Sequence, residues 1–286
     1  CLGEGHDTFS GFDAIQGTTQ GHRHRPGGIQ TEEDYRFVLT RYLESCLTQN
    51  IRYTEASQNI TIAQVLYPQL DPITARQRFF LLCREMVALF ESRGVILRFY
   101  HCANKTVKAN VRETLDQRAA EWVQWLKEAQ ETAPGIFVGM TTAGHEESEI
   151  QSGGPEAMAA AYHAVAAMGL GVEGHYGEGV GVEHMLNAMR CLPETTRYAH
   201  GIQVVESQEA MALVRARGIP LIMMPCINIA LGSLIHYKDG IPSPKFEADG
   251  KTRRAGVIKK HILSLHEHPL FHLLREQRLP IALSSD

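Results

Sequence analysis

The sequence predicts an α/β fold, a (β/α)8 barrel of the TIM type whose first strand lies outside the 286 residues. Three observations carry this prediction. Short apolar runs alternate with longer helical patterns, which is typical of a parallel sheet covered by helices. Polar side chains follow the apolar runs at their carboxyl ends, where such a barrel places its active site. No apolar run leads directly into a phosphate-binding glycine loop, so an open nucleotide-binding sheet is the weaker alternative.

Seven segments are predicted as strands because each is short, apolar and bounded by turn residues. Numbered as the second to eighth strands of a barrel, they cover 51–57, 95–101, 136–144, 171–175, 197–201, 219–226 and 279–286. Seven helices are predicted between them, at 32–47, 72–92, 107–129, 155–169, 181–190, 207–218 and 268–277. Pro155 suits the first turn of a helix, where its missing N–H costs nothing. Gly169 and Gly218 stand where helices end in a left-handed residue.

Composition excludes several classes of protein. The net charge is −4, with no basic patch for a nucleic-acid partner, and no apolar run is long enough to span a membrane. The first residues have neither the basic nor the apolar region of a signal peptide. Six cysteines contain no CxxC pair, which favours reduced thiols in a cytoplasmic protein. The 14 histidines favour a metal site with nitrogen and oxygen ligands.

The candidate site residues follow three of the predicted strands. His175 and Glu178 lie three positions apart in GVEGHYGEGVG, His200 ends the next strand, and Asp286 ends the last. Singly, each has an ordinary explanation. A histidine at a strand end is most often hydrogen-bonded for structural reasons, and a glutamate such as Glu178 often stabilises a helix N-terminus. Together, at the ends of the fifth, sixth and eighth strands, they indicate a catalytic centre.

These segments resemble the adenosine deaminase family over nearly the whole chain and in the same order. HYGE resembles the family's His-Ala-Gly-Glu motif, and YAHG resembles its Gly-His-Gly motif. MPCINIALG resembles Cys-Pro-x-Ser-Asn-x-x-x-Gly, and the last 19 residues resemble the helix and strand that lead to its Ser/Thr-Asp-Asp-Pro motif. TTAGHEE resembles Leu-Ala-Gly-Asp-Glu less closely, with His145 in place of the aspartate.

The resemblance implies one zinc ion per chain, held by two histidines of the first strand together with His175 and Asp286. His200 then orients or deprotonates the zinc-bound water, whose pKa the metal lowers. Glu178 protonates purine N1 while hydroxide attacks C6, and ammonia leaves. The backbone N–H of Gly144 meets purine N3. Gly177 lets the chain turn so that Glu178 faces the same substrate, and lets a flat purine approach closely.

One motif departs from the family's pattern. The first-strand His-x-His pair has only HRH at 22–24 as a counterpart, and this lies in a polar, glycine-containing stretch typical of a loop. We therefore expect a fragment that begins after the first strand and ends at Asp286, where the family continues with a second aspartate. The expected organisation is one barrel domain over 1–286. Its excursion after the seventh strand, 233–268, is either a solvated surface loop or a lid.

The expected function is zinc-dependent hydrolytic deamination of a 6-aminopurine, most of all adenosine. Adenine or a modified adenosine is the alternative substrate, and a catalytically silent homologue with a binding role is the alternative class. A two-metal hydrolase is disfavoured, because the fourth strand ends in MTTAG without the lysine or bridging carboxylate such sites use. The expected partner is a small-molecule purine, and the oligomeric state stays open.

Overall fold

The computed structural model describes residues 29–106, 114–247 and 252–284. Seven strands form one parallel sheet in which each pairs with the next along the chain. They are β1 (Tyr53–Gln58), β2 (Ile96–Asn104), β3 (Phe137–Ala143), β4 (Gly171–Tyr176), β5 (Arg197–His200), β6 (Leu221–Met223) and β10 (Ile281–Leu283). All seven predicted strands are confirmed. The predicted strand at 219–226 is shorter, because a helix begins at Pro225, a residue suited to a first turn.

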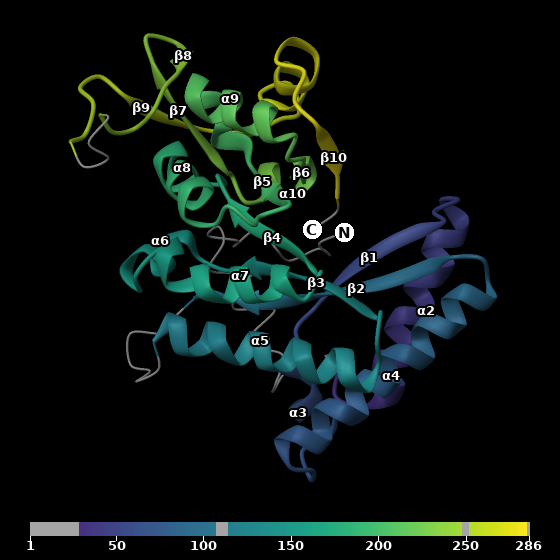
Figure 1. Ribbon diagram of the computed structural model, residues 1–286. Helices are drawn as coiled ribbons and strands as arrows, with labels where there is room; N and C mark the ends of the chain where they lie inside the picture. Colours follow the sequence, from purple (N-terminus) through teal and green to yellow (C-terminus); the bar gives the residue numbers. More distant parts are fainter. Residues whose placement is uncertain (1–28, 107–113, 248–251, 285–286) are drawn as a thin grey trace.

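The sheet curls into a partial barrel whose edges are β1 and β10 (Figure 1). A contact across the inside shows the curvature. Arg197 on β5 is paired with Glu55 on β1 at 2.5 Å, although three strands separate β5 from β1 in the sheet. The same guanidinium lies 4.1 Å from the ring centroid of Tyr100 on β2. The fold is thus a partial barrel of the TIM type, as the sequence predicts.

Helices follow the strands and cover the outside of the sheet. They are α2 (Glu32–Thr48), α3 (Ile62–Leu66), α4 (Pro72–Ser92), α5 (Leu115–Thr132), α6 (Glu146–Gln151), α7 (Ala159–Ala167), α8 (Val182–Cys191), α9 (Gln208–Arg217) and α10 (Pro225–Ala230). Short 3-10 turns are η2 (Pro155–Met158) and η3 (Ile202–Glu206). Local chemistry explains several ends. Asp71 accepts from the N–H groups of Ile73 and Thr74 to begin α4, and Gly218 ends α9 with φ +63°.

Two predicted helices need correction, and a third lies partly outside the described residues. The segment 155–169 divides into η2 and α7. The predicted helix 268–277 is helical over 270–276, most of it as the π-helical turn η4 (His272–Glu276), and Arg278 follows with φ +52°. Its wider hydrogen bonding runs from the N–H of Gln277 to the carbonyl of His272, a form that occurs in short pieces. Of the predicted helix 107–129, residues 107–113 are outside the described residues.

The excursion 233–268 contains an antiparallel sheet that the sequence did not predict. Its strands are β7 (Leu234–Lys238), β8 (Ile241–Pro242) and β9 (Ile258–His261), with β7 in the centre. All four side chains of β9 are exposed, so it lacks the alternation of apolar and polar residues that marks a half-buried strand. The excursion is thus an ordered small sheet beside the barrel (Figure 1).

The main core lies between the helices and the outer face of the barrel sheet. Phe80 of α4 packs against Phe137 of β3 with ring centroids 5.6 Å apart, and Phe137 is equally close to Phe99 of β2. All three rings are fully buried. Edge-to-face and tilted packing of this kind holds the strands that lead to the carboxyl ends.

Two expectations from composition can be compared with the described residues. Cys46, Cys83, Cys102, Cys191 and Cys226 are free thiols, as predicted, while Cys1 lies outside the described residues. In the described parts of the chain, no helix combines the length and the apolar character needed to cross a membrane.

Candidate active site

Two histidines meet where β4 and β5 end. These strands pair in parallel register, with His175 opposite Ala199 and Tyr176 opposite His200. The rings of His175 and His200 have centroids 5.1 Å apart and planes inclined by 68°. The side chain of His175 is 14% exposed and that of His200 is 3% exposed. The predicted association of these two residues is therefore present in the structure.

Glu178 reaches the same point from the loop that follows β4. Its Oε2 lies 3.6 Å from Nε2 of His200, and its side chain is 15% exposed. Gly177 precedes it with φ +76°, a conformation in which glycine carries little strain. The predicted turn at Gly177 is present, and it directs Glu178 towards His200.

A buried carboxylate shapes this loop. Glu146, at the start of α6, accepts hydrogen bonds from the backbone N–H of Gly177 at 2.7 Å and of Gly179 and Val180 at 3.3 Å. One side chain thus satisfies three donors of a loop that has no regular structure to satisfy them. On the neighbouring strand, His200 itself has φ +63°, an uncommon conformation for a residue with a side chain. Such local strain is typical of functional sites.

A cavity of about 220 Å³ opens beside these groups. It is lined by three segments, which are 144–147, 178–180 and 231–234, so that Gly144 and Glu178 border it and Gly177 does not. Gly144 has φ +121°, and a Cβ there would lie 2.6 Å from Oγ1 of Thr106 and 2.7 Å from Oδ1 of Asn104. At Gly177 a Cβ would instead meet Sδ of Met185 at 2.8 Å. Gly144 therefore borders the space that a ligand would fill, and substrate contact at either glycine stays a prediction.

The fit of a zinc ion can be tested on the hydrogen bonds of His175. The hydroxyl of Thr141 donates to Glu173 Oε1 at 2.6 Å, because a carboxylate can only accept. Its oxygen therefore accepts from Nδ1–H of His175 at 3.1 Å. The in-plane lone pair of His175 is then on Nε2. A histidine that donates from one nitrogen and offers the other is the usual form of a metal ligand, so His175 fits this role.

The remaining predicted ligands are outside the described residues. Asp286 follows β10, whose described neighbour Ser284 donates from its N–H to the carbonyl of Met223 at 3.0 Å. The HRH motif at 22–24 is also outside them. Within 29–106, 114–247 and 252–284, no group of three His, Cys, Asp or Glu side chains is placed to hold a metal ion. Of the predicted ligands, His175 alone lies within the described residues.

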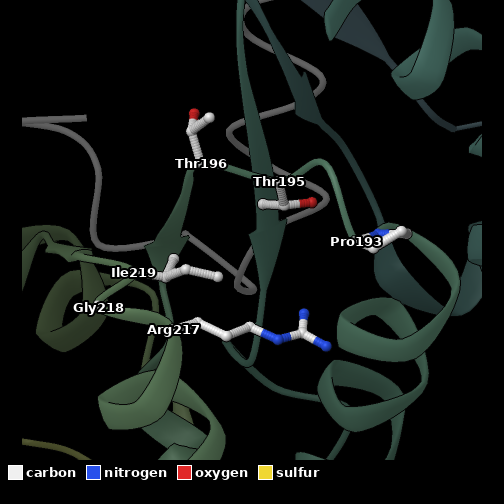
Figure 2. A pocket seen from close by; sticks show the side chains of 6 residues that line it. All are labelled: Pro193, Thr195, Thr196, Arg217, Gly218 and Ile219. Carbon is white, nitrogen blue, oxygen red and sulfur yellow. The ribbon is translucent and has the colours of Figure 1, made fainter.

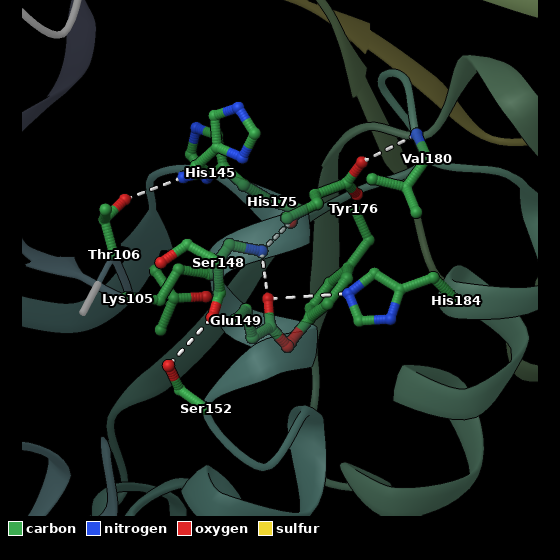
Figure 3. A network of polar contacts seen from close by, with 12 residues as sticks. Lys105, Thr106, His145, Ser148, Glu149, Ser152, His175, Tyr176, Val180 and His184 are labelled. Carbon is green, nitrogen blue, oxygen red and sulfur yellow. Dashed lines mark hydrogen bonds and ion pairs between the residues drawn. The ribbon is translucent and has the colours of Figure 1, made fainter. Parts of the chain in front are cut away.

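A buried ion pair supports the site from behind (Figure 3). Lys105 follows β2 and contacts Oε2 of Glu149 at 2.6 Å, and both side chains are fully buried. The same ammonium donates to the main-chain oxygen of His175 at 2.6 Å and lies 4.0 Å from the ring centroid of Tyr176. Burial raises the pKa of Glu149, but Lys105 and His184 outweigh it and lower the pKa to about 2. The Lys105 ammonium, held by its ion pair with Glu149, thereby fixes the main-chain carbonyl of His175.

A second, wider cavity of about 520 Å³ lies at the other end of the strands (Figure 2). Thr195 and Thr196, which line it, precede β5, and Arg217, Gly218 and Ile219 precede β6. In a barrel of this type, residues at the amino ends of strands serve stability and those at the carboxyl ends serve chemistry. The smaller cavity beside Glu178 is therefore the candidate active site.

Two residues of the site escaped the sequence prediction. Glu146 holds the loop that carries Glu178, and Lys105 holds the main chain at His175. Asn228, the asparagine of MPCINIALG, belongs to the predicted resemblance, but its contact with His200, Nδ2 to Nδ1 at 3.1 Å, was not predicted. Lys105 follows an apolar strand, but nothing in the sequence indicates that its charge is buried.

The chain is thus a partial barrel of the TIM type with His175, Glu178 and His200 close together at the carboxyl ends of β4 and β5. Neither protein-family models nor curated protein sequences give a match to this chain. Among solved structures it is similar to adenine deaminase from Arthrobacter aurescens, with a TM-score of 0.65, 20% identity, and coverage of 90% of this chain and 64% of that one.

Two further structures show the same likeness. An N6-methyl-AMP deaminase from Arabidopsis has a TM-score of 0.59 and 15% identity, and the match covers 96% of this chain and 66% of that one. A Burkholderia ambifaria amidohydrolase with bound Zn has a TM-score of 0.54 and 22% identity, and the match covers 69% and 49%. At these identities the likeness establishes the fold, and the chain spans less than two thirds of the length of these proteins. The predicted resemblance to adenosine deaminase-like proteins is confirmed at this level.

Proposed function

We propose that this chain carries the active site of a zinc-dependent hydrolytic deaminase of a 6-aminopurine, with adenosine as its preferred substrate. One observation carries the proposal. Glu178 and His200 approach to 3.6 Å beside His175, at the carboxyl ends of neighbouring parallel strands and next to a cavity bordered by Gly144. An acid, an imidazole and a metal-ligand histidine at one point are the parts that hydrolytic deamination requires.

His175 and Asp286 are the residues of this chain that would hold the zinc ion. When bound, zinc would lower the pKa of a water molecule towards neutrality and so supply a nucleophile. Thr141 keeps His175 turned so that Nε2 faces a ligand. Asp286 has this role through the resemblance alone, because it lies outside the described residues.

The proposed reaction adds water to C6 of the purine and releases ammonia. An oxygen–carbon bond forms at C6, the bond from C6 to the amino nitrogen breaks, and the ring retains the oxygen. Of the two hydrogens of the water, one replaces the proton that Glu178 gives to ring N1, and the other ends on the amino nitrogen, which leaves as ammonia. Glu178 donates a proton to ring N1 as C6 is attacked, which prevents negative charge from building up on the ring. His200 directs the attacking oxygen. Gly144 lines the cavity in which the flat ring would lie, and the contacts that a Cβ there would make with Thr106 and Asn104 keep a side chain out of this position.

The choice among aminopurines is the finer part of the proposal. Two of the structures named above are an adenine deaminase and an N6-methyl-AMP deaminase, which supports a purine substrate in this cavity. Residues that line the cavity at 231–234 lead into the excursion, so we assign the small sheet β7–β9 as a lid. The free thiols support a reducing compartment, and we keep the cytoplasmic location as part of the proposal.

Ammonia release from a panel of purines tests the proposal. The complete natural protein, supplied with zinc, would be assayed with adenosine, adenine, AMP and N6-methyl-AMP. We expect release from adenosine above the others. Release from adenine or N6-methyl-AMP alone would correct the substrate but keep the reaction. A folded, zinc-loaded protein that releases ammonia from none of them would indicate a binding homologue.

Replacing Glu178 by glutamine separates proton donation from metal binding. We expect Glu178→Gln to lower kcat by about 10³-fold, because general acid catalysis contributes roughly 10² to 10⁴ in rate. Zinc content, measured by atomic absorption, should stay at the wild-type value. The matched control is Glu121→Gln, which removes an exposed carboxylate from α5 and should leave kcat unchanged. A Glu178→Gln protein with a near-normal rate would contradict the assigned role.

A further inference from the structure

His268 is a buried histidine outside the group of residues that face the cavity. It precedes Pro269 at the end of the excursion and is 3% exposed. Both of its ring nitrogens have partners. Nδ1 is 3.1 Å from the backbone nitrogen of Leu270, and Nε2 is 3.2 Å from Oδ1 of Asn228. Asn228 in turn touches His200, so a continuous chain of polar contacts connects His268 with the active site.

The first contact fixes where the proton of His268 lies. A backbone N–H can only donate, so Nδ1 of His268 must accept from Leu270 and cannot carry hydrogen. A neutral imidazole carries one hydrogen, which is then on Nε2. Burial lowers the pKa of His268 to about 4, so the ring is neutral at physiological pH. The ring therefore donates from Nε2 to its neighbour.

The second contact fixes the amide of Asn228. Because His268 donates, the atom of Asn228 that faces it must be the carbonyl oxygen, and the NH₂ group faces the other way. An independent contact agrees. Ser233 donates its hydroxyl hydrogen to Oε1 of Glu178 at 3.4 Å, so its oxygen accepts from Nδ2 of Asn228 at 3.3 Å. Asn228 is fully buried, which makes a reversed amide costly.

The third contact passes this constraint to His200. The NH₂ group of Asn228 lies 3.1 Å from Nδ1 of His200 and can only donate, so Nδ1 must accept. A neutral His200 then carries its hydrogen on Nε2, the nitrogen 3.6 Å from Oε2 of Glu178. The buried contacts thus determine which nitrogen of His200 presents an N–H to the site.

We infer that His268 is a positioning residue that acts through the Asn228 amide to hold His200 as the Nε2–H tautomer, with its N–H on the side of Glu178, which lines the cavity. The inference extends to function only if the proposed deaminase activity holds. In that case His200 begins the reaction as a hydrogen-bond donor that orients the attacking oxygen and does not begin it as a base. The proposed function by itself leaves both roles open.

Nuclear magnetic resonance of histidine labelled with ¹⁵N tests the tautomers directly. The natural full-length protein would be recorded at neutral pH in long-range ¹H–¹⁵N correlation spectra, with His200 and His268 assigned by single substitutions. We expect Nε2 to be the protonated nitrogen in both rings. Protonated Nδ1 in either ring would overturn the inference. The measurement needs no substrate, so failure of the deaminase assay cannot be mistaken for failure of the tautomer assignment.

Two variants test the direction of the effect. Asn228→Asp offers only acceptor oxygens, so we expect the hydrogen of His200 to move to Nδ1. His268→Phe keeps the ring volume but removes the donor to Asn228, so we expect His200 to lose its single tautomer. His268→Gln can donate and accept as histidine does and should restore it. His163→Phe, at an exposed histidine paired with Glu194, is the control and should change nothing.

A folded His268→Phe protein in which His200 keeps only Nε2–H would show that His268 has no positioning role. If that variant does not fold, Asn228→Asp decides the question. An unchanged His200 tautomer in Asn228→Asp would equally overturn the inference.

Discussion

The two halves of the site, at β3–β4 and at β5–β6, hold the same kind of side chain in opposite states. On the β3–β4 side, Thr141 accepts a hydrogen from Nδ1 of His175, and the lone pair is on Nε2. On the β5–β6 side, Asn228 donates to Nδ1 of His200, and the hydrogen is on Nε2. The first ring has the form that a metal ligand would need, and the second presents an N–H. The hydrogen bonds that Thr141 and Asn228 make elsewhere leave one of them as acceptor and the other as donor, and so fix different tautomers in two histidines 5.1 Å apart.

The largest expected effect separates the two histidines by metal content. We expect His175→Ala to lose zinc. Removing a residue that only hydrogen-bonds to a metal ligand lowers metal affinity by roughly 10- to 100-fold, and removing the ligand itself should lower it further. His200→Ala should keep zinc at the wild-type level. Atomic absorption after dialysis against a chelator measures both. Equal zinc loss in the two variants would contradict the different roles of the two histidines, because His200 would then also be a ligand.

The next effect concerns the buried pair that supports only the His175 side. Lys105→Met leaves Glu149 without its cation and should lower the free energy of unfolding by about 3–5 kcal/mol, measured in urea at pH 7. The pKa of Glu149 is lowered from 4.5 to about 2 in the folded protein. Its contribution is therefore present above pH 4.5 and is lost as the pH falls towards 2, so the difference between variant and wild type should shrink in acid.

An exposed lysine of α5 provides the control for this measurement. Lys127→Met removes a positive charge at the surface and should change the free energy of unfolding by less than about 0.5 kcal/mol. A Lys105→Met protein as stable as Lys127→Met would show that the buried pair contributes nothing to stability.

A smaller effect is expected from reversing the amide on the His200 side. Asn228→Asp should lower kcat for ammonia release by about 10²-fold, because His200 would then present the wrong nitrogen. KM and zinc content should change little. Asn59→Asp is the matched control, since its oxygen already accepts from the N–H of Thr61 and an aspartate can do the same. Loss of zinc from Asn228→Asp would contradict the separation of the two halves.

The smallest effect should come from the hydroxyl that orients His175. Thr141→Val removes the acceptor for Nδ1–H, so we expect zinc affinity to fall by roughly 10- to 100-fold. Titration with a competing chelator measures this change. Thr142→Val is the control on the same strand, because its hydroxyl contacts Tyr162 and not His175. A Thr141→Val protein with wild-type affinity would show that the ring needs no such support.

Local patterns were enough to predict the strands and the residues that end them. The alternation of short apolar runs with helical segments predicted all seven strands, and the strand-end positions of His175, Glu178 and His200 predicted that these residues lie close together. Residues that act through distant partners could not be found in this way. Lys105 and Glu149 are 44 positions apart (149 − 105) and become partners only when β2 and α6 pack together. Asn228 and His268 meet across the excursion.

The small sheet of the excursion escaped prediction for a different reason. Strand β9 is exposed along its length and β8 has two residues, so neither has the apolar face by which strands are recognised. Asp286 and the HRH motif lie outside the described residues, and their roles stay predictions.

The order of the strands in the sheet also has a consequence for folding. From β1 to β6 every strand pairs with its immediate successor, so these pairings can form one after another while the chain is being synthesised. The pairing of β6 with β10 is different, since Leu221 must find Ile281 after the whole excursion has been made. Contacts of long sequence separation form slowly. We therefore expect β10 to join the sheet in a late folding step. Because the predicted ligand Asp286 follows β10, the active site would be completed only after the other six strands have paired.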